Sequence, residues 1–364
     1  MLTFFACLYH KYFSANIPQL FCVFFGTDEN SLIVLKEILN SPHSAELVIT
    51  ASDKIRTRGN RKTPTPVKKY CVENQVAVVE EIPSLEKLTE VDPDIIVVAS
   101  YGKIIPDEII NFPKHGALNI HPSLLPKYRG PSPVQTALLN GDQTSGVTIM
   151  ILDSGIDTGP IVLQKECDIG SSPNLNYQDI HSDWSDPLRT NRRYFLKEVT
   201  EEFFRIGAKM LIEILDSPEL IKSAEIQDHP LATMTKKFTK EDGHISWNQP
   251  GEKIINHIRA FGDNIGAYSF LDGKKIKIFD VVFANDCISP YYQFLGNKTS
   301  PEYRTRGKLG IYPQDLLIVT VEDGMMIIDQ LQVEGKSKIS GSDFIRGYKF
   351  YDDINAFKSY KSLS

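Results

Sequence analysis

Short apolar runs alternate with segments of helical spacing through the first 216 residues, and this alternation constrains the fold more than any other feature. We predict strands over seven such runs, at 20–27, 46–50, 76–79, 94–100, 116–121, 146–152 and 161–165. Helices are predicted between or after them, at 31–39, 66–74 and 201–215. This rhythm is typical of a mainly parallel sheet covered by helices on both faces. The pattern therefore predicts a Rossmann-like α/β domain over 20–216, in which 171–197 is an insertion or mobile loop.

The sequence after residue 217 is dominated by short β-rich runs, with one helical segment at 251–261. Asp272-Gly273 and Asp323-Gly324 separate such runs and predict β-hairpins, because tight hairpin turns need residues that tolerate a positive φ. We predict a linker at 217–230 and a small β-barrel domain at 231–355.

Composition and charge exclude several classes of protein. No stretch approaches the roughly 18 unbroken apolar residues of a membrane span, so no membrane association is expected. The five cysteines are scattered without a CxxC pair, so we expect neither a disulfide framework nor a metal site. The net charge of −6 excludes a generally basic nucleic-acid coat. Residues 1–27 contain no Asp or Glu, and 1–19 read as a possible mitochondrial leader, although they lack the usual arginines.

The densest cluster of candidate site residues lies between Ala117 and Gly130. Asn119 and His121 are two apart on a predicted strand, so their side chains leave the same face. The Pro-Ser-Leu-Leu-Pro run that follows ends the strand, at the sheet edge where α/β folds bind ligands. After another apolar strand, Asp157 lies in a turn rich in acids and glycines. Taken singly, a strand-end histidine and an Asp-x-Thr-Gly turn each have an ordinary structural explanation.

Together these motifs resemble the folate-dependent formyltransferases, which share Asn, His two residues on, a Ser-Leu-Leu-Pro stretch and a later Asp in an Asp-x-Gly context. The resemblance implies the formyltransferase fold, a C-terminal barrel similar to oligonucleotide-binding (OB) folds, and a catalytic trio of Asn119, His121 and Asp157. Three features depart from the family pattern. Residues 171–197 have no counterpart, 261–268 lack the usual prolines, and Tyr128 stands where bacterial members often carry Trp.

The chemistry implied by the resemblance is attack of an amine on the formyl carbon of 10-formyltetrahydrofolate. Asn119 would donate a hydrogen bond to the developing oxyanion, and a cationic His121 would stabilise the same charge. Asp157 would orient His121 and, through water, help to remove the proton from the amine. An α-amino group has a pKa of roughly 7.7–8.0, so a fair share is already the free base and no metal is required. By the same resemblance, the folate co-substrate would lie along Ser123, Leu124, Leu125, Pro126, Lys103, Ile104 and Ile105.

A basic segment after the second predicted strand bears on the identity of the amine. Residues 54–69 hold seven basic residues and no acid, and their glycine and prolines mark them as a loop. A charge run is usually a solvated face, but this one lies at the same sheet edge as the predicted site. It therefore suggests a polyanionic substrate held by its phosphates. The loop and the second domain are features of the family members that formylate initiator methionyl-tRNA, which implies tRNA contacts from Arg56, Arg58, Arg61, Lys62 and Lys68.

Three other functions remain open from the sequence. One is a formyltransferase that acts on a small amine, such as an amino sugar or glycinamide ribonucleotide, which the basic loop and second domain disfavour. Another is a non-catalytic tRNA-binding protein, which the complete trio disfavours. The third is a hydrolase that releases formate, which should lack the basic loop. We expect a monomer located in the mitochondrial matrix, because formylated initiator tRNA belongs to bacteria and organelles.

Overall fold

The computed structural model describes residues 19–55, 62–170, 195–262, 265–283, 307, 309–312 and 316–348. Residues 1–18 of the predicted leader and 171–194 of the predicted insertion lie outside these ranges. The described chain divides into two compact units. The first draws on Met1–Gly130, Gly146–Cys167 and Thr200–Thr235, and the second on Pro131–Ser145, Asp168–Val199 and Lys236–Ser364. No helix of the described residues is long and apolar enough to cross a membrane.

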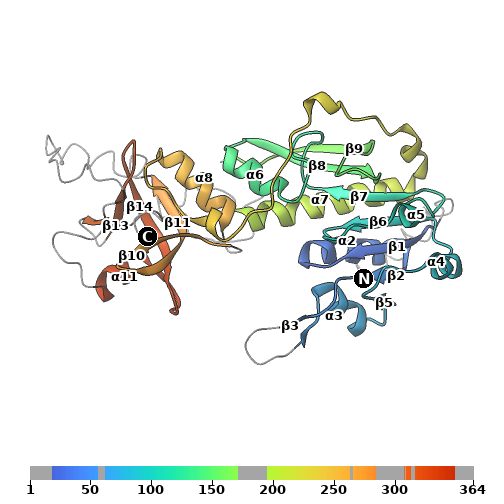
Figure 1. Cartoon of the computed structure of the whole chain (residues 1–364), viewed down its shortest axis with the longest axis horizontal. Helices are drawn as coiled ribbons and strands as arrows, with labels where there is room; N and C mark the ends of the chain where they lie inside the picture. The colour runs from blue at the N-terminus through green and yellow to red at the C-terminus, as the bar shows by residue number, and fades with distance from the viewer. Residues whose placement is uncertain are drawn as a thin grey trace, which may run out of the picture. The chain divides into compact units, whose positions relative to one another are not determined.

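The first unit is built on a seven-stranded sheet in the order β5-β2-β1-β6-β7-β8-β9 (Figure 1). Its strands are β1 (Phe21–Gly26), β2 (Ser44–Ile49), β5 (Val78–Val79), β6 (Ile95–Ala99), β7 (Ala117–His121), β8 (Thr144–Ile151) and β9 (Ile161–Asp168). Its helices are α2 (Glu29–Leu39), α3 (Pro66–Glu73), α4 (Leu85–Val91), α5 (Asp107–Ile110) and α7 (Leu196–Asp216). The strands from β5 to β7 pair in parallel, and β8 runs antiparallel to β7. The mainly parallel sheet confirms the predicted Rossmann-like class.

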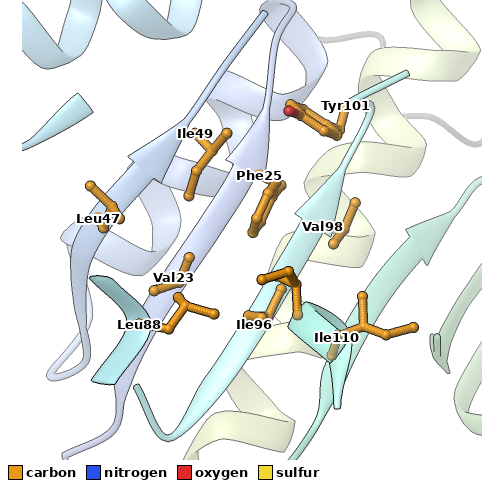
Figure 2. Close-up of a cluster of buried hydrophobic side chains, with 11 residues drawn as sticks. Val23, Phe25, Leu47, Ile49, Leu88, Ile96, Val98, Tyr101 and Ile110 are labelled. Atoms are coloured by element: carbon orange, nitrogen blue, oxygen red, sulfur yellow. The ribbon is translucent and has the colours of Figure 1, made fainter. Parts of the chain in front are cut away.

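Helices cover both faces of this sheet. On one face, Leu88 of α4 and Ile110 of α5 pack with Val23, Phe25 and Ile96 in a buried apolar cluster (Figure 2). On the other face, α2 lies against β1, since a Cβ added at Gly26 would stand 2.6 Å from the Cβ of Ser31. α7 lies against β7 and β8, where Gly207 of α7 approaches Ile120. Apolar strands buried on both faces explain why the sequence shows continuous apolar runs rather than alternation.

Capping residues fix where the first helices begin. The Asp28 carboxylate accepts a hydrogen bond from the backbone N–H of Ser31 at 3.0 Å, and Thr65 accepts one from Lys68 at 3.1 Å. Pro66 occupies the first turn of α3, where no intrahelical N–H is needed. These caps start α2 directly after β1 and start α3 inside the basic segment 54–69, so that Lys68 and Lys69 lie on the helix.

The second unit contains an antiparallel sheet in the order β10-β11-β14-β13-β12, with β15 paired to β14. Its strands are β10 (Ala267–Leu271), β11 (Lys274–Phe283), β12 (Leu309–Tyr312), β13 (Leu316–Thr320), β14 (Met325–Val333) and β15 (Lys338–Ser340). Its helices are α6 (Pro133–Asn140), α8 (Gly251–Phe261) and α11 (Gly341–Gly347). Both predicted hairpins form, and Asp272 and Gly273 adopt the positive φ that the first turn requires.

The segment that follows α7 carries the short 3-10 helices η2 (Pro218–Ser223) and η3 (His229–Leu231), and η4 (Glu241–Gly243) lies further on. Residues 200–235 pack with the first unit. The two-stranded β3 (Lys54–Ile55) and β4 (Lys62–Thr63) pair antiparallel at the base of the basic loop.

Candidate active site

The candidate site lies at the carboxyl edge of the parallel strands, where β7 ends next to β6. β1 pairs with β2 on one side and β6 on the other, which is the switch point at which open α/β sheets bind ligands. The loops after β1 and β6 are tied together across this point. The Ser100 hydroxyl donates to the Asp28 carboxylate at 2.7 Å, and the Thr27 hydroxyl donates to the Tyr101 carbonyl at 3.2 Å. The edge is therefore held by fixed loops.

One face of β7 extends from the buried apolar cluster to the candidate site. Ala117 belongs to the buried apolar cluster, and Asn119 and His121 follow it at the same pleat position. Asn119 pairs in parallel with Val98, another member of that cluster. The face thus changes from apolar to polar at the last two of these positions, which lie where the strand ends. The predicted placement of Asn119 and His121 on one face agrees with this register.

The structure brings His121 and Asp157 together. The Nδ1 atom of His121 lies 3.6 Å from Oδ2 of Asp157, and Nε2 donates to the Tyr128 carbonyl oxygen at 3.0 Å. The His121 side chain is 5% exposed and the Asp157 side chain 16% exposed. Both ring nitrogens therefore face oxygen acceptors, and both can donate at once only when the ring is cationic.

Asn119 provides the free donor of the trio. Its side chain is half-buried and makes no hydrogen bond to another residue in the described part of the chain. An amide left open at the rim of the sheet can donate to a ligand oxygen. Since Nε2 of His121 is engaged by the Tyr128 carbonyl, Asn119 is the residue of the trio that can offer an N–H to a ligand.

The Asp157 loop is constrained at several points. Asp157 has φ +53°, and its Oδ2 accepts from the Gly130 N–H at 2.7 Å. Asp153 ties the loop internally, accepting from the Thr158 hydroxyl at 2.7 Å. A Cβ at Gly159 would stand 1.8 Å from the carbonyl oxygen of Ile151, so only glycine fits without a backbone shift. The carboxylate is therefore fixed by backbone geometry.

The residues predicted along folate divide by exposure. Ser123 and Leu125 are buried, whereas Leu124 and Pro126 are half-buried. The Ser123 hydroxyl donates to the Lys127 carbonyl at 2.7 Å, so it shapes its own loop. On the loop after β6, Ile104 is 92% exposed, Lys103 is exposed, and Ile105 packs on the core cluster.

The predicted tRNA contacts are only partly within the described chain. Arg56, Arg58 and Arg61 lie outside it, and Lys62 is exposed on β4. Lys68 differs from Lys62, because Asp53 accepts from its ammonium at 2.8 Å and Glu80 accepts at 2.5 Å. These hydrogen bonds raise the pKa of Lys68, and the Lys68 bond lowers the pKa of Glu80. Lys68 thus ties the base of the basic loop to neighbouring acids.

Several residues that support the site lie outside any recognisable sequence pattern. Thr148 of β8 donates to the Ser123 carbonyl at 2.6 Å, and Gln164 of β9 donates to the Leu125 carbonyl at 2.9 Å. Arg129 and Gln227 are buried and joined to each other beside Asp157. Of these four residues, Arg129 is the one that lies inside the 117–130 motif, so the sequence could have pointed to Arg129 but not to the others.

Two domain families match the chain. Residues 20–181 match the family described as formyl transferase, and 237–349 match the formyl transferase C-terminal domain. A methionyl-tRNA formyltransferase of Syntrophomonas wolfei is 30% identical over 347 residues, covering 91% of this chain and 97% of that protein. One from Carboxydothermus hydrogenoformans is 35% identical over 332 residues, covering 90% and 96%.

Solved structures share the fold. An N-formyltransferase from Helicobacter canadensis, crystallised with folinic acid and dTDP-3-aminofucose, aligns with a TM-score of 0.56 at 19% identity. The alignment covers 85% of this chain and 99% of that one. Fold, site and similarity together define the class: the chain belongs to the formyl transferase family, whose members transfer formyl groups. The curated relatives that match it across both domains are named methionyl-tRNA formyltransferases.

Proposed function

We propose that the chain transfers the formyl group of 10-formyltetrahydrofolate to the α-amino group of initiator methionyl-tRNA. The observation that carries the proposal is similarity along both domains. Bacterial methionyl-tRNA formyltransferases align over about nine tenths of this chain and nearly their own full length. A formyltransferase for a small amine would have no need of the basic loop.

The trio supports a transfer driven by positioning and charge. The amine nitrogen forms a bond to the formyl carbon, and the bond from that carbon to the folate nitrogen breaks. Asn119, whose amide is open, donates to the formyl oxygen as negative charge develops there. His121 adds its charge from beside Asp157, in a buried setting where such interactions are stronger than in water. The proton leaving the amine passes through water to the Asp157 carboxylate, and the leaving folate nitrogen regains a proton from solvent.

Side chains on the loop after β6 suit a folate. Ile104 presents an almost fully exposed apolar side chain, and the neighbouring Lys103 presents a cation. A folate is flat and largely apolar at its ring end and carries carboxylates at the other end, so it can use both features. Leu124 and Pro126 would add partly open apolar contacts on the opposite loop. Ser123 and Leu125 would act by holding that loop in shape.

The basic loop is proposed to bind the acceptor stem through Arg56, Arg58, Arg61 and Lys62, with Lys68 anchoring its base. An Arg58→Glu variant should raise KM for methionyl-tRNA by about tenfold or more and leave KM for the folate unchanged, since phosphate contacts dominate such affinity. Lys87→Glu is the matched control, because Lys87 is an exposed helical lysine on α4 whose ammonium pairs with Glu90 at 2.9 Å. Equal effects of the two variants would remove the loop from tRNA binding.

The direct test offers the purified chain three acceptors with 10-formyltetrahydrofolate: methionyl-tRNA, glycinamide ribonucleotide and a nucleotide-linked amino sugar. Formylmethionyl-tRNA should form with a kcat/KM at least about 10³-fold above either small amine, because their missing contacts cannot contribute binding energy. Transfer to a small amine alone would replace the proposed acceptor. Binding of tRNA without any formyl transfer would support the non-catalytic reading instead.

We propose the mitochondrial matrix as the protein's location and a monomer as its working form. The absence of acidic residues from positions 1–27 supports this location, since organelle leaders avoid acids. A fluorescent protein fused after Met1–Gln19 should concentrate in mitochondria. Diffuse fluorescence in the cytosol would refute the proposed address.

A further inference from the structure

The segment after η2, residues 224–235, is hydrogen-bonded both to the loop that follows His121 and to the start of β9 after the Asp157 loop; we call it the return segment. At one end Glu225 and Ile161 exchange two backbone hydrogen bonds of 2.8 Å each, just beyond the Asp157 loop. At the other end the backbone N–H of Arg129 donates to the Thr233 carbonyl at 2.8 Å, and the Arg129 carbonyl accepts from the backbone N–H of Thr235 at 2.7 Å. The return segment therefore bridges the loops on either side of the candidate site.

A buried glutamine lies at the middle of this bridge. The side-chain N–H groups of Gln227 donate to the carbonyls of Asp157 at 2.9 Å and Gly159 at 2.7 Å. Its carbonyl oxygen accepts from Arg129, at 3.1 Å from Nε and 2.6 Å from Nη2. Both polar atoms of the Gln227 amide are therefore satisfied inside the protein, although the residue is only 4% exposed. The amide joins the backbone of the Asp157 loop to the Arg129 guanidinium.

Arg129 is a buried cation without a carboxylate partner among the described residues. It is 6% exposed, and besides Gln227 its guanidinium meets Nδ1 of His229 at 2.9 Å. Because a guanidinium only donates, Nδ1 of His229 is the acceptor and its hydrogen lies on Nε2. Burying a cation against neutral acceptors is costly unless its hydrogen bonds are met. Apolar packing would fill the same space at less cost, so the arrangement calls for a further role.

The residues on either side of Arg129 indicate that role. The Tyr128 carbonyl accepts from Nε2 of His121 at 3.0 Å, and the Gly130 N–H donates to the Asp157 carboxylate at 2.7 Å. Arg129 thus sits between the two backbone groups that hold the imidazole and the carboxylate. Through Gln227 it also reaches the backbone of Asp157 itself. The contacts run His121, Tyr128, Arg129, Gln227 and Asp157, and close again on His121.

We infer that Gln227 and Arg129 are positioning residues, which set the separation of His121 and Asp157 for the transfer step. The inference rests on the proposed formyl transfer. The return segment would then be part of the active site, in addition to connecting the two domains. The Gln227 amide donates to the Asp157 backbone and holds it in place, and Arg129 in turn holds the Gln227 amide.

The test compares Gln227→Met and Gln227→Glu with Gln143→Met. Methionine keeps the length of the side chain and removes all of its hydrogen bonds. Glutamate keeps an acceptor for Arg129 and places oxygen against the carbonyls of Asp157 and Gly159. Gln143 is the control, because its exposed amide also donates to a backbone carbonyl, that of Gly141 at 3.1 Å, away from the trio.

Both Gln227 variants should lower kcat for methionyl-tRNA formylation by about 10- to 100-fold, since small misplacements of reacting groups cost this much. KM for both substrates should stay within about threefold, and Gln143→Met should match the wild type. Rates are expressed per folded molecule from circular dichroism, so that lost folding is not counted as lost catalysis. If Gln227→Met does not fold, Gln227→Glu decides, because Arg129 keeps a partner there.

A second measurement does not depend on any substrate. The ¹⁵N chemical shifts of the His121 ring at one fixed pH should move in Gln227→Met toward those of Asp157→Asn, and stay unchanged in Gln143→Met. Two results would overturn the positioning role. One is a Gln227→Met variant whose His121 shifts are unchanged, and the other is a variant with a raised KM but a wild-type kcat. If the wild type formylates no tRNA, the proposed function fails, and the His121 shifts still decide the positioning.

Discussion

Replacement of Asp157 by Asn removes one charge from the trio and keeps the size of the side chain. The relevant distance is 3.6 Å between Nδ1 of His121 and Oδ2 of Asp157. At an effective dielectric constant of about 20, two unit charges at this separation interact by roughly 5 kcal/mol, which is a ceiling for the loss. Partial exposure of Asp157 and the dipole of the new amide reduce it to roughly 3–4 kcal/mol, or about 10²–10³-fold in rate.

Single-turnover formylation of methionyl-tRNA, with enzyme and folate in excess, isolates the chemical step. We expect its rate to fall by about 10²–10³-fold, with tRNA binding within about threefold of the wild type. The unfolding midpoint should change little, since the Asn amide oxygen can still accept from the Gly130 N–H. A loss below about tenfold, or an effect on tRNA affinity alone, would refute the electrostatic role of Asp157.

Three further outcomes follow from the structure. Gly159→Ala should displace the Asp157 loop, because its Cβ would stand 1.8 Å from a backbone oxygen, and should reduce kcat by about tenfold or more; Gly347→Ala, which meets no atom within 4 Å, is the control and should keep wild-type kinetics. Phe25→Ala should lower the free energy of unfolding by about 3–5 kcal/mol in urea titrations, since Phe25 is fully buried in the core cluster; a loss under about 1 kcal/mol would contradict that packing. Burial lowers the pKa of His257, so the unfolded state binds more protons than the folded state below about pH 6.5. The contribution of neutral His257 to the free energy of unfolding is therefore complete above that pH and is lost as the solution is acidified. The urea midpoint should be lower at pH 5.5 than at pH 7.5, and the difference between the two midpoints should be smaller in His257→Gln.

The sheet of the first unit could be predicted because its strands are apolar on both sides. Val23 and Phe24 point to opposite faces of β1 and both are fully buried, so the apolar run itself marks a strand covered by helices. The alignment of Asn119 and His121 also follows from local geometry, since residues two apart on a strand share a face. The position of Asp157 relative to them does not follow locally. It was inferred from family resemblance.

The parts of the site that sequence missed depend on contacts between distant segments. Gln227 binds Asp157 from 70 positions further along the chain, and no periodicity or spacing predicts such a contact. Ser123 shows the opposite difficulty. It lies in the motif that marked the folate residues, yet its hydroxyl is engaged by the Lys127 carbonyl within the same loop. A motif identifies the segment, and hydrogen bonds decide which of its side chains face a ligand.

Lys68 illustrates the same limit for charge. In sequence it belongs to a basic segment without acids, but the acids that hold it come from positions 53 and 80, on either side of that segment. Its placement fixes the base of the loop and leaves the exposed Lys62 as the other basic residue of the proposed contacts within the described chain. Charge counting along the sequence treats these two lysines as equivalent, and the structure separates them.

Formyl transfer to methionyl-tRNA is proposed to take place at the site formed by Asn119, His121 and Asp157. The most direct measurement follows labelled formyl from 10-formyltetrahydrofolate into methionyl-tRNA, with wild type and His121→Ala side by side. We expect rapid formation of formylmethionyl-tRNA by the wild type, and a rate lower by at least about 10³-fold in the variant, which should still bind the tRNA. Wild-type protein that leaves methionyl-tRNA unformylated, or a variant that formylates it at the wild-type rate, would contradict the account.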